Sequence, residues 1–221
     1  MLKLEDLNLQ GLKIYQDDEL YCFTSDAVLL SRFATVKKGD VVADFCSGSG
    51  IVGFNLYGLN PTLVKSVTFF EMQKCMYDLS LKSIRLNNLA DKFTAVNSRL
   101  QDINCEYNEK FSLIVCNPPY MKKNSGEVNA NDSVAICRTE LELDLESLIL
   151  AVSKCLKFGG RACIVHRAER LVDVICEMRK RNIEPKRLQT VYSGKKEPYL
   201  FLIEGVKGGK SGLKILSPVE N

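Results

Sequence analysis

The chain has 221 residues, of which 46% are hydrophobic and 26% are charged, a composition ordinary for a globular protein. This length suffices for one sizeable core and does not require a second globular unit, so we expect a single domain over residues 1–221. Apolar runs stay well short of the ~20 residues that cross a bilayer, and acidic residues stand near the start, which excludes a typical signal peptide and favours a cytoplasmic protein without a membrane partner.

The net charge of +3 hides an asymmetry along the chain. Residues 1–150 contain 15 basic and 20 acidic side chains, whereas residues 151–221 contain 15 basic and 7 acidic ones. The basic second part favours a nucleic-acid partner, because clustered positive charge attracts a polyanion. Solvated basic side chains at the ends of helices and loops are an equally good interpretation.

Cysteine and histidine usage argues against disulfides and metal. The nine cysteines are odd in number, scattered, and never spaced as Cys-x-x-Cys, and His166 is the single histidine. We therefore expect reduced thiols and no bound metal.

Residues 1–35 do not fit the pattern of the rest and are expected to form an N-terminal extension packed on the core. Residues 12–15 and 20–23 could pair as two strands around a polar turn. Ser25 and Asp26 could cap a helix over residues 27–33.

From residue 36 to 221, which we expect to be the catalytic α/β core, short β-rich runs alternate with helical patterns. The expected strands are 41–45, 67–70, 93–96, 111–116, 162–165 and 188–192, and the expected helices are 51–57, 72–88, 145–156 and 169–181. Repeated strand-helix units predict a mostly parallel, doubly wound, Rossmann-like sheet. Residues 199–204 and 213–216 flank a glycine-rich turn and could form a C-terminal antiparallel hairpin.

The first expected strand of this core runs into a glycine-containing loop, Asp44-Phe45-Cys46-Ser47-Gly48-Ser49-Gly50. Glycine can adopt positive φ and lets a ligand approach the backbone, and the following helix offers unpaired N–H groups. Glu71 ends the second strand, where a carboxylate can accept hydrogen bonds from a ribose diol. Nicotinamide dinucleotide enzymes share these features, so the loop alone leaves the cofactor open, and a tight turn without any ligand is a further alternative.

A second motif, Asn117-Pro118-Pro119-Tyr120, follows the fourth strand at the carboxyl edge of the sheet. Prolines lack N–H donors and leave carbonyl groups that can point into a cleft. A target NH2 group could donate to the Asn117 side-chain carbonyl and to the Pro118 backbone carbonyl, while Tyr120 stacks on a flat substrate. The alternative is a proline turn with a packed tyrosine.

These two motifs carry a resemblance. The loop ending at Gly50 is similar to the first motif of class I S-adenosylmethionine methyltransferases, with Cys46 in place of the commoner first glycine. The Asn-Pro-Pro-Tyr motif resembles the fourth motif of methyltransferases that act on adenine N6, guanine N2 or glutamine Nδ. Together with Ile14-Tyr15-Gln16, residues 23–30, Arg138-Thr139-Glu140 and residues 166–171, they resemble the bacterial tRNA1(Val) adenine-N6-methyltransferase family, whose enzymes modify the adenine beside the anticodon.

The resemblance implies S-adenosylmethionine as cofactor, tRNA as substrate and a role for each matching residue. The implied catalytic residues are Asn117, Pro118, Pro119 and Tyr120. The implied cofactor contacts are Thr24, Ser25, Asp26, Asp44, Cys46, Ser47, Gly48, Gly50, Glu71, Met72, Arg99 and Asn117. The implied RNA contacts are Lys122, Lys123, Arg138, Arg167 and Arg170, with an ion pair between Arg138 and Glu140 as an equal alternative. His166 is expected to be a packing residue, because the reaction needs no strong base.

One departure concerns the segment after the third strand, where such enzymes commonly have an acid for the cofactor adenine. This chain has Ser98 and Arg99 there, and Gln101 or Asp102 could substitute. Three other functions stay open: methylation of ribosomal RNA guanine N2, methylation of a release-factor glutamine, and RNA binding without catalysis. The short segment before the core argues against the release-factor enzymes, which usually carry an N-terminal helical domain. The sequence does not indicate an oligomeric state.

Overall fold

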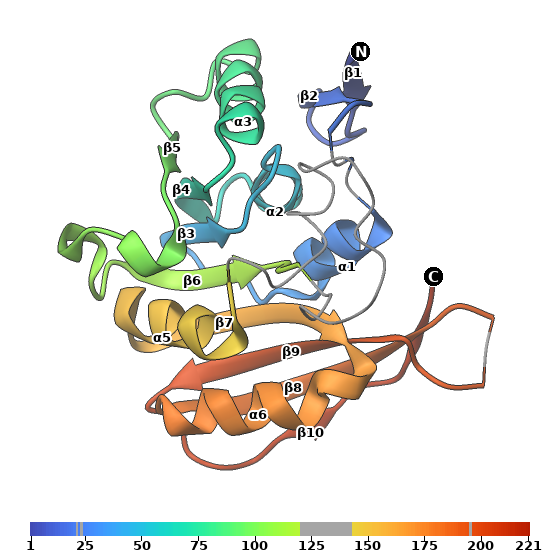
Figure 1. The fold of residues 1–221 in the computed structure, drawn as a ribbon, viewed down its shortest axis with the longest axis vertical. Coiled ribbons are helices and arrows are strands. Elements are labelled where there is room, and N and C mark those ends of the chain that lie inside the picture. Colours follow the sequence, from blue (N-terminus) through green and yellow to red (C-terminus); the bar gives the residue numbers. More distant parts are fainter. Residues whose placement is uncertain (21, 23, 120–142, 195) are drawn as a thin grey trace.

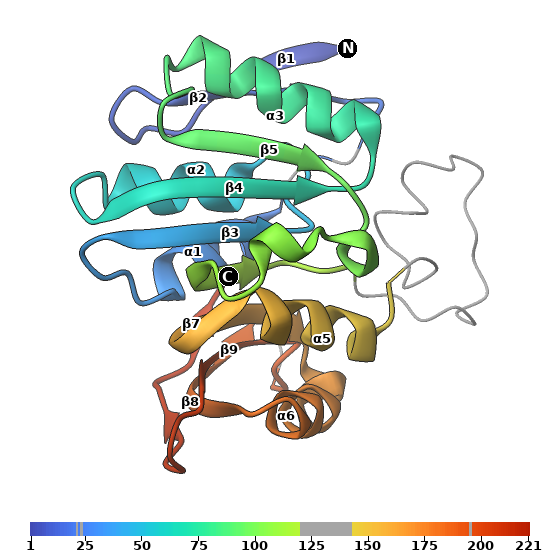
Figure 2. The same cartoon turned by 90° about the vertical axis from the view of Figure 1, so that its left-hand side faces the viewer.

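The computed structural model describes residues 1–221 except 21, 23, 120–142 and 195. In that part of the chain one nine-stranded sheet has the order β10-β8-β9-β7-β6-β3-β4-β5, with β11 also paired to β8. Figure 2 shows most of these strands stacked in this order. The strands are β3 (Asp40–Phe45), β4 (Val64–Glu71), β5 (Phe93–Asn97), β6 (Phe111–Cys116), β7 (Leu156–Arg167), β8 (Ile183–Tyr192), β9 (Leu200–Lys207), β10 (Lys214–Ile215) and β11 (Val219–Glu220).

The central strands β5, β4, β3, β6 and β7 pair in parallel. The helices between and around them are α1 (Ser25–Phe33), α2 (Ile51–Leu59), α3 (Lys74–Leu86), α5 (Leu145–Cys155) and α6 (Leu171–Lys180). This arrangement confirms the predicted α/β class and the doubly wound, Rossmann-like sheet.

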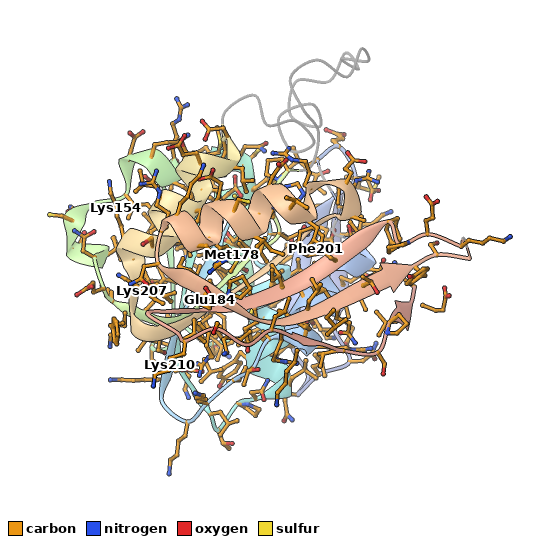
Figure 3. The ribbon with its side chains drawn as sticks, turned by 90° about the horizontal axis from the view of Figure 1, so that it is seen from below. Lys154, Met178, Glu184, Phe201, Lys207 and Lys210 are labelled. Carbon is orange, nitrogen blue, oxygen red and sulfur yellow. The ribbon has the colours of Figure 1, made fainter. Side chains whose placement is uncertain are left out.

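Two apolar clusters cover the two faces of the sheet, because successive strand residues point to opposite sides. Val42 and Leu113 face the cluster that includes residues of α1 and α2. Ala43 and Ile114, one residue further along each strand, face the cluster built with α5 and α6. In Figure 3, Met178 of α6 and Phe201 of β9 lie between the helix and the sheet, and both are fully buried.

The antiparallel hairpin of the second half of the chain exists, but its partners differ from the expected ones. β9 pairs antiparallel with both β7 and β8, whereas β10 pairs parallel with β8. The predicted pairing of residues 199–204 with 213–216 is therefore wrong. Buried residues fill β9, which takes an inner position, and the exposed β10 adds to the outer edge at β8.

The N-terminal extension also pairs differently from the prediction. β1 (Leu2–Asp6) forms a separate two-stranded sheet with β2 (Lys13–Asp17), so the expected pairing of 12–15 with 20–23 is wrong. The turn between these strands is made by positive-φ residues, including Asn8 and Gly11. The hairpin is fastened to α3, because the backbone N–H of Tyr15 donates to Ser83 Oγ over 2.9 Å. How far residues 1–35 form a unit of their own stays a prediction.

Helix α1 begins at Ser25, and Thr24 holds the N-cap position without a side-chain capping bond among the described contacts. Ser25 and Asp26 therefore lie in the first turn and do not cap the helix, which corrects the prediction. Figure 1 shows α1 beside α2. A carboxylate in the first turn, here Asp26, is favourable because the helix dipole is positive at that end.

The carboxyl ends of the parallel strands meet at one edge of the sheet. This carboxyl edge carries the ends of β3 at Phe45, of β4 at Glu71, of β5 at Asn97 and of β6 at Cys116. Most predicted site residues that the structure describes belong to these strand ends or to the loops that follow them. Arg167 lies at the corresponding end of β7, and the exceptions are Arg170 and the residues at the start of α1, Thr24, Ser25 and Asp26.

Candidate functional site

The loop between β3 and α2 is a tight turn with three residues in the left-handed region. Cys46, Gly48 and Gly50 have φ values of 55°, 55° and 89°. The N–H of Ser47 donates to Phe70 O over 3.1 Å, and that of Gly50 donates to Ser47 O over 2.8 Å. The left-handed conformation destabilises the backbone of a non-glycine residue by about 1–2 kcal/mol. Cys46 incurs this cost, and a glycine at the same position would avoid it.

Two glycines let the start of α2 press directly onto β4. A Cβ atom on Gly50 would lie 2.8 Å from the Phe69 ring, and one on Gly53 would lie 2.5 Å from the same ring. Both distances are shorter than van der Waals contact, so neither position accepts a side chain without movement. The first turn of α2 is therefore held close to the strand ends, with its N–H groups at the carboxyl edge.

Asp44 lies behind this loop and is fully buried. Its Oδ2 accepts a 2.9 Å hydrogen bond from the Gly53 N–H, and burial raises the pKa of the carboxyl to about 8. Its Oδ1 and the Ser47 hydroxyl are buried and have no hydrogen-bond partner among the described residues. Buried polar atoms without partners are costly, and a polar ligand at the carboxyl edge would supply partners for these two. The residues present thus fit a ligand that both donates and accepts hydrogen bonds, as S-adenosylmethionine does.

Glu71 links the loop to the end of β4 by hydrogen bonds. Its Oε2 accepts a hydrogen bond from the Gly48 N–H, and its Oε1 accepts one from the Gln73 N–H, both over 2.8 Å. The side chain is buried, and this burial raises the pKa of the carboxyl against the effect of these bonds. The Met72 N–H also donates to this carboxylate. Two carboxylate oxygens accept about four hydrogen bonds in all, so these three leave room for the predicted ribose contact.

Asn97, which the sequence interpretation missed, links β5 to the segment after Glu71. Its Nδ2 donates to the carbonyl oxygens of Glu71 and Met72 over 2.8 and 3.0 Å. The signal was a polar residue at the end of a strand next to Glu71. Arg99 is exposed and directly precedes a 3-10 turn, Leu100–Asp102. The cofactor role of Arg99, and the substitute role of Gln101 or Asp102, stay predictions.

The register of the sheet brings Asn117 beside the glycine loop. Cys116 is the Cα partner of Phe45 on one side and of Ile164 on the other, so Asn117 and Cys46 follow at the same level. Asn117 and Pro119 are half-buried and Pro118 is buried. Burial and a hydrogen bond with the Cys46 thiol raise the pKa of the Cys116 thiol well above its usual value. Tyr120, Lys122, Lys123 and Arg138 lie outside the described residues.

The first turn of α1 lies at the same edge as the loop. Asn221 Nδ2 donates to Ser25 Oγ over 2.6 Å, and the Asn221 N–H donates to the carbonyl of Tyr192, the last residue of β8. Beyond the other end of α1, the Thr35 N–H donates to Glu204 over 3.0 Å. β8 runs in the same direction as β7, because both are antiparallel to β9. The structure therefore brings Thr24, Ser25 and Asp26 to the carboxyl edge.

The predicted RNA contacts differ in how they are placed. Arg167 ends β7 and is exposed at the carboxyl edge. Arg170 is buried, and its Nε donates to Asp173 over 2.8 Å, which gives it a structural partner three residues along the chain. His166 is buried, its Nδ1 accepts from the Arg167 N–H over 2.9 Å, and burial together with nearby arginines lowers its pKa to about 4. The burial of His166 agrees with the predicted packing role.

Much of the basic character of residues 151–221 is engaged elsewhere. Arg179, Lys180 and Arg181 form ion pairs with Glu184, Glu177 and Glu146. Lys186 Nζ donates to the carbonyls of Lys210 and Ser211, and Arg187 contacts Glu204. These contacts favour the interpretation that the basic side chains of residues 179–187 are partnered surface charges over the interpretation that they form an RNA-binding surface.

Two further searches concern only the described part of the chain. No group of three or more His, Cys, Asp or Glu side chains in it could hold a metal ion. None of its helices is both long and apolar enough to span a membrane. The expectation of a metal-free protein stays a prediction.

The chain is similar to known methyltransferases. The family model described as "Methyltransferase small domain" matches residues 23–180. A relative from Flavobacteriaceae bacterium (strain 3519-10), named tRNA1(Val) (adenine(37)-N6)-methyltransferase, is 27% identical over 212 residues, covering 87% of this chain and 86% of the relative. A relative of the same name from Shewanella baltica is 26% identical over 158 residues, and the match spans 69% of this chain and 64% of that protein.

A solved structure shows the same fold. The Agrobacterium tumefaciens protein Atu636, described as a predicted O-methyltransferase, has a TM-score of 0.68 at 17% identity, covering 89% of this chain and 88% of that one. The family match covers the glycine loop, Glu71 and Asn117, which the sheet collects at one edge. The chain belongs to the methyltransferase small domain family and is an S-adenosylmethionine-dependent methyltransferase.

Proposed function

We propose that the protein methylates the N6 amino group of adenine in tRNA, at the adenine beside the anticodon of tRNA1(Val). The observation that carries this proposal is the register that sets Asn117 beside the Cys46–Gly50 loop. The name and the coverage of the Flavobacteriaceae relative support the adenine and the tRNA. Such a substrate agrees with the cytoplasmic location expected from the sequence.

The residues at the carboxyl edge have two proposed roles, binding of the cofactor and orientation of the target nitrogen. Asp44, Glu71 and the loop from Cys46 to Gly50 would hold the cofactor, together with Met72 and residues 24–26. When bound, S-adenosylmethionine supplies an electrophilic methyl group on a sulfonium. The role of Arg99 at the cofactor adenine is part of the proposal.

Asn117 and Pro118 orient the target nitrogen. A planar amino group donates its two N–H bonds to the Asn117 side-chain carbonyl and the Pro118 backbone carbonyl, which aims the nitrogen lone pair at the methyl group. Pro119 stiffens this turn, and Tyr120 would stack on the base.

No strong general base is required, because the nitrogen becomes acidic once it carries the methyl group and water can take its proton. His166 agrees with this assignment: its pKa is about 4, and its Nδ1 already accepts a backbone hydrogen bond. Its imidazole is therefore neutral at physiological pH and is held in place, and we assign it no part in proton transfer.

RNA recognition is proposed for Arg167, which is exposed beside the site. Lys122, Lys123 and Arg138 keep the same proposed role from the resemblance. For Arg170 we propose that it supports the Arg167 segment through Asp173, because its side chain is buried and paired there.

The test uses isotopically labelled S-adenosylmethionine with unmodified bulk tRNA, followed by nucleoside mass spectrometry. Labelled N6-methyladenosine is the expected product. Asn117→Ala should abolish it while largely sparing cofactor binding. Asn108→Ala changes an exposed residue at the opposite edge of the sheet and should leave the product unchanged. Label on guanosine N2 or on a release-factor glutamine would replace the proposed substrate, and cofactor binding without any transfer would indicate an RNA-binding protein.

A further inference from the structure

Three polar side chains link the first turn of α1 to the β8–β9 region at the carboxyl edge. Asn221 follows β11, and its Nδ2 donates to Ser25 Oγ over 2.6 Å and to the Tyr199 hydroxyl over 2.5 Å. An amide nitrogen carries two N–H bonds, so one amide can serve both hydroxyls. This Ser25–Asn221–Tyr199 link joins segments that are 196 and 22 residues apart in the chain.

Backbone contacts fix the far end of the link. The Tyr199 N–H donates to Val191 O over 3.0 Å, and its carbonyl accepts from the Ala168 N–H over 3.0 Å. The Asn221 N–H donates to Tyr192 O over 2.9 Å, and β11 itself pairs with β8. Tyr199 directly precedes β9 and Asn221 directly follows β11, and both are hydrogen-bonded to the sheet, whereas Ser25 belongs to a helix that lies over it.

Among the contacts of the described residues, the hydroxyl of Ser25 donates to no acceptor, so its proton is available to a ligand. A serine hydroxyl has one donor and two acceptor sites, and Asn221 occupies an acceptor site. Since Ser25 is exposed, that proton can be donated to a ligand at the carboxyl edge. The methionine carboxylate of S-adenosylmethionine is such an acceptor.

We infer that Tyr199 and Asn221 are positioning residues, which hold the first turn of α1 and the Ser25 hydroxyl in place for the cofactor. The inference rests on the proposed cofactor role of Thr24, Ser25 and Asp26. Neither Tyr199 nor Asn221 needs to touch the cofactor or the RNA. Their effect is on cofactor affinity, because they preorganise a contact and take no part in methyl transfer.

The experiment measures binding of S-adenosylhomocysteine to the full chain by titration calorimetry. Tyr199→Phe, Asn221→Ala and Ser25→Ala should each raise the Kd about 3- to 10-fold, as expected for the loss of one or two hydrogen bonds. The double variant Tyr199→Phe with Asn221→Ala should bind no more weakly than Asn221→Ala alone, because both act through one link. Ser25→Thr keeps the hydroxyl and should restore the wild-type Kd.

Controls separate positioning from a general loss of structure. Tyr57→Phe removes the hydroxyl of a half-buried tyrosine of α2 that packs on Phe93 of β5. This variant should bind the cofactor product as the wild type does. The variants of the link should raise the KM for S-adenosylmethionine while kcat at saturating cofactor and the KM for tRNA change less than about twofold. Their thermal midpoints should match that of Tyr57→Phe.

Several outcomes would overturn the inference. Wild-type affinity in both Tyr199→Phe and Asn221→Ala, with weak binding in Ser25→Ala, would show that Ser25 acts without the link. Equal losses in kcat and in tRNA affinity would show a structural role. Wild-type affinity in Ser25→Ala would show that the first turn of α1 has no cofactor role. Absence of binding by the wild-type protein would reject the proposed cofactor site as a whole. Both results differ from a failure of the link alone.

Discussion

The carboxylate of Glu71 accepts the Gly48 N–H over 2.8 Å and so ties the end of β4 to the glycine loop that follows β3. Its other oxygen accepts from Gln73 at the start of α3. One side chain thus orders the backbone on both sides of the expected ribose position. The contact makes Glu71 a part of the loop's structure even before a cofactor binds.

Glu71→Gln should therefore weaken both the loop and the cofactor site. A glutamine offers one oxygen for two backbone N–H groups, and one donor is left facing an NH2 group, at a cost of about 1–3 kcal/mol. We expect a lower thermal midpoint and an approximately tenfold higher Kd for S-adenosylhomocysteine. Glu106→Gln, which changes an exposed carboxylate, serves as control. Unchanged affinity in Glu71→Gln would remove the carboxylate from the cofactor site.

Gly50→Ala should be far more damaging than Gly159→Ala. Both glycines have positive φ, 89° and 73°, so both variants incur the backbone cost of about 1–2 kcal/mol. Only at Gly50 does the new Cβ meet the Phe69 ring at 2.8 Å, whereas nothing lies within 4 Å at Gly159. Thermal unfolding and S-adenosylhomocysteine titration of both variants isolate the steric effect. Equal losses in the two would mean that backbone strain alone matters.

The sequence predicted the central strands because their signals are local. Residues 41–45 and 111–116 are mostly apolar runs of strand length, and the structure places β3 and β6 over nearly the same residues. The loop of Cys46 to Gly50 was recognisable because it combines small residues with a helix start, and it shows the positive φ that glycine permits. Position at the carboxyl edge followed from the order of the strands.

The pairings that were wrong depend on distant parts of the chain. The residues of β1 alternate as Leu-Lys-Leu-Glu, but all five are exposed, so no buried face identifies the strand or its partner. The turn at Asn8 and Gly11 selects that partner. β10 is two exposed residues long and is defined only by the free edge of β8. Asn97 was missed for a similar reason: its bonds to Glu71 and Met72 cross between strands.

Stability should fall with rising pH because of Asp44. Its folded pKa is raised to about 8, so between pH ~4 and 8 the folded state keeps a proton that the unfolded state releases. The unfolded state binds fewer protons, and ∂ΔG/∂pH of unfolding from this group is negative, at most about 1.4 kcal/mol per pH unit. The contribution is constant below the unfolded pKa and changes no further above pH ~8.

Asp44→Asn should remove this pH dependence. Asparagine keeps an oxygen for the Gly53 N–H and carries no charge, so the variant should become more stable relative to the wild type as pH rises from 5 to 8. Denaturant unfolding at pH 5, 6.5 and 8 measures the difference. The matched variant Asp78→Asn alters an exposed carboxylate paired with Lys74 in α3 and should show no such trend. Parallel curves for Asp44→Asn and the wild type would contradict the raised pKa.

Arg167→Glu should weaken tRNA binding, and Arg179→Glu should not. Arg167 is exposed at the carboxyl edge, at the end of the strand that pairs with β6. Arg179 is paired with Glu184 at the end of α6, at the opposite edge of the sheet. Reversing a charge near the phosphates should raise the Kd about tenfold at low salt, and the difference should shrink as salt rises, because counterion release drives such contacts. Filter binding at several salt concentrations measures both effects. Equal tRNA affinities of the two variants would place the RNA on another surface. A loss of tRNA affinity in Arg167→Glu that persists at high salt would indicate lost structure, since screening does not restore a misfolded segment.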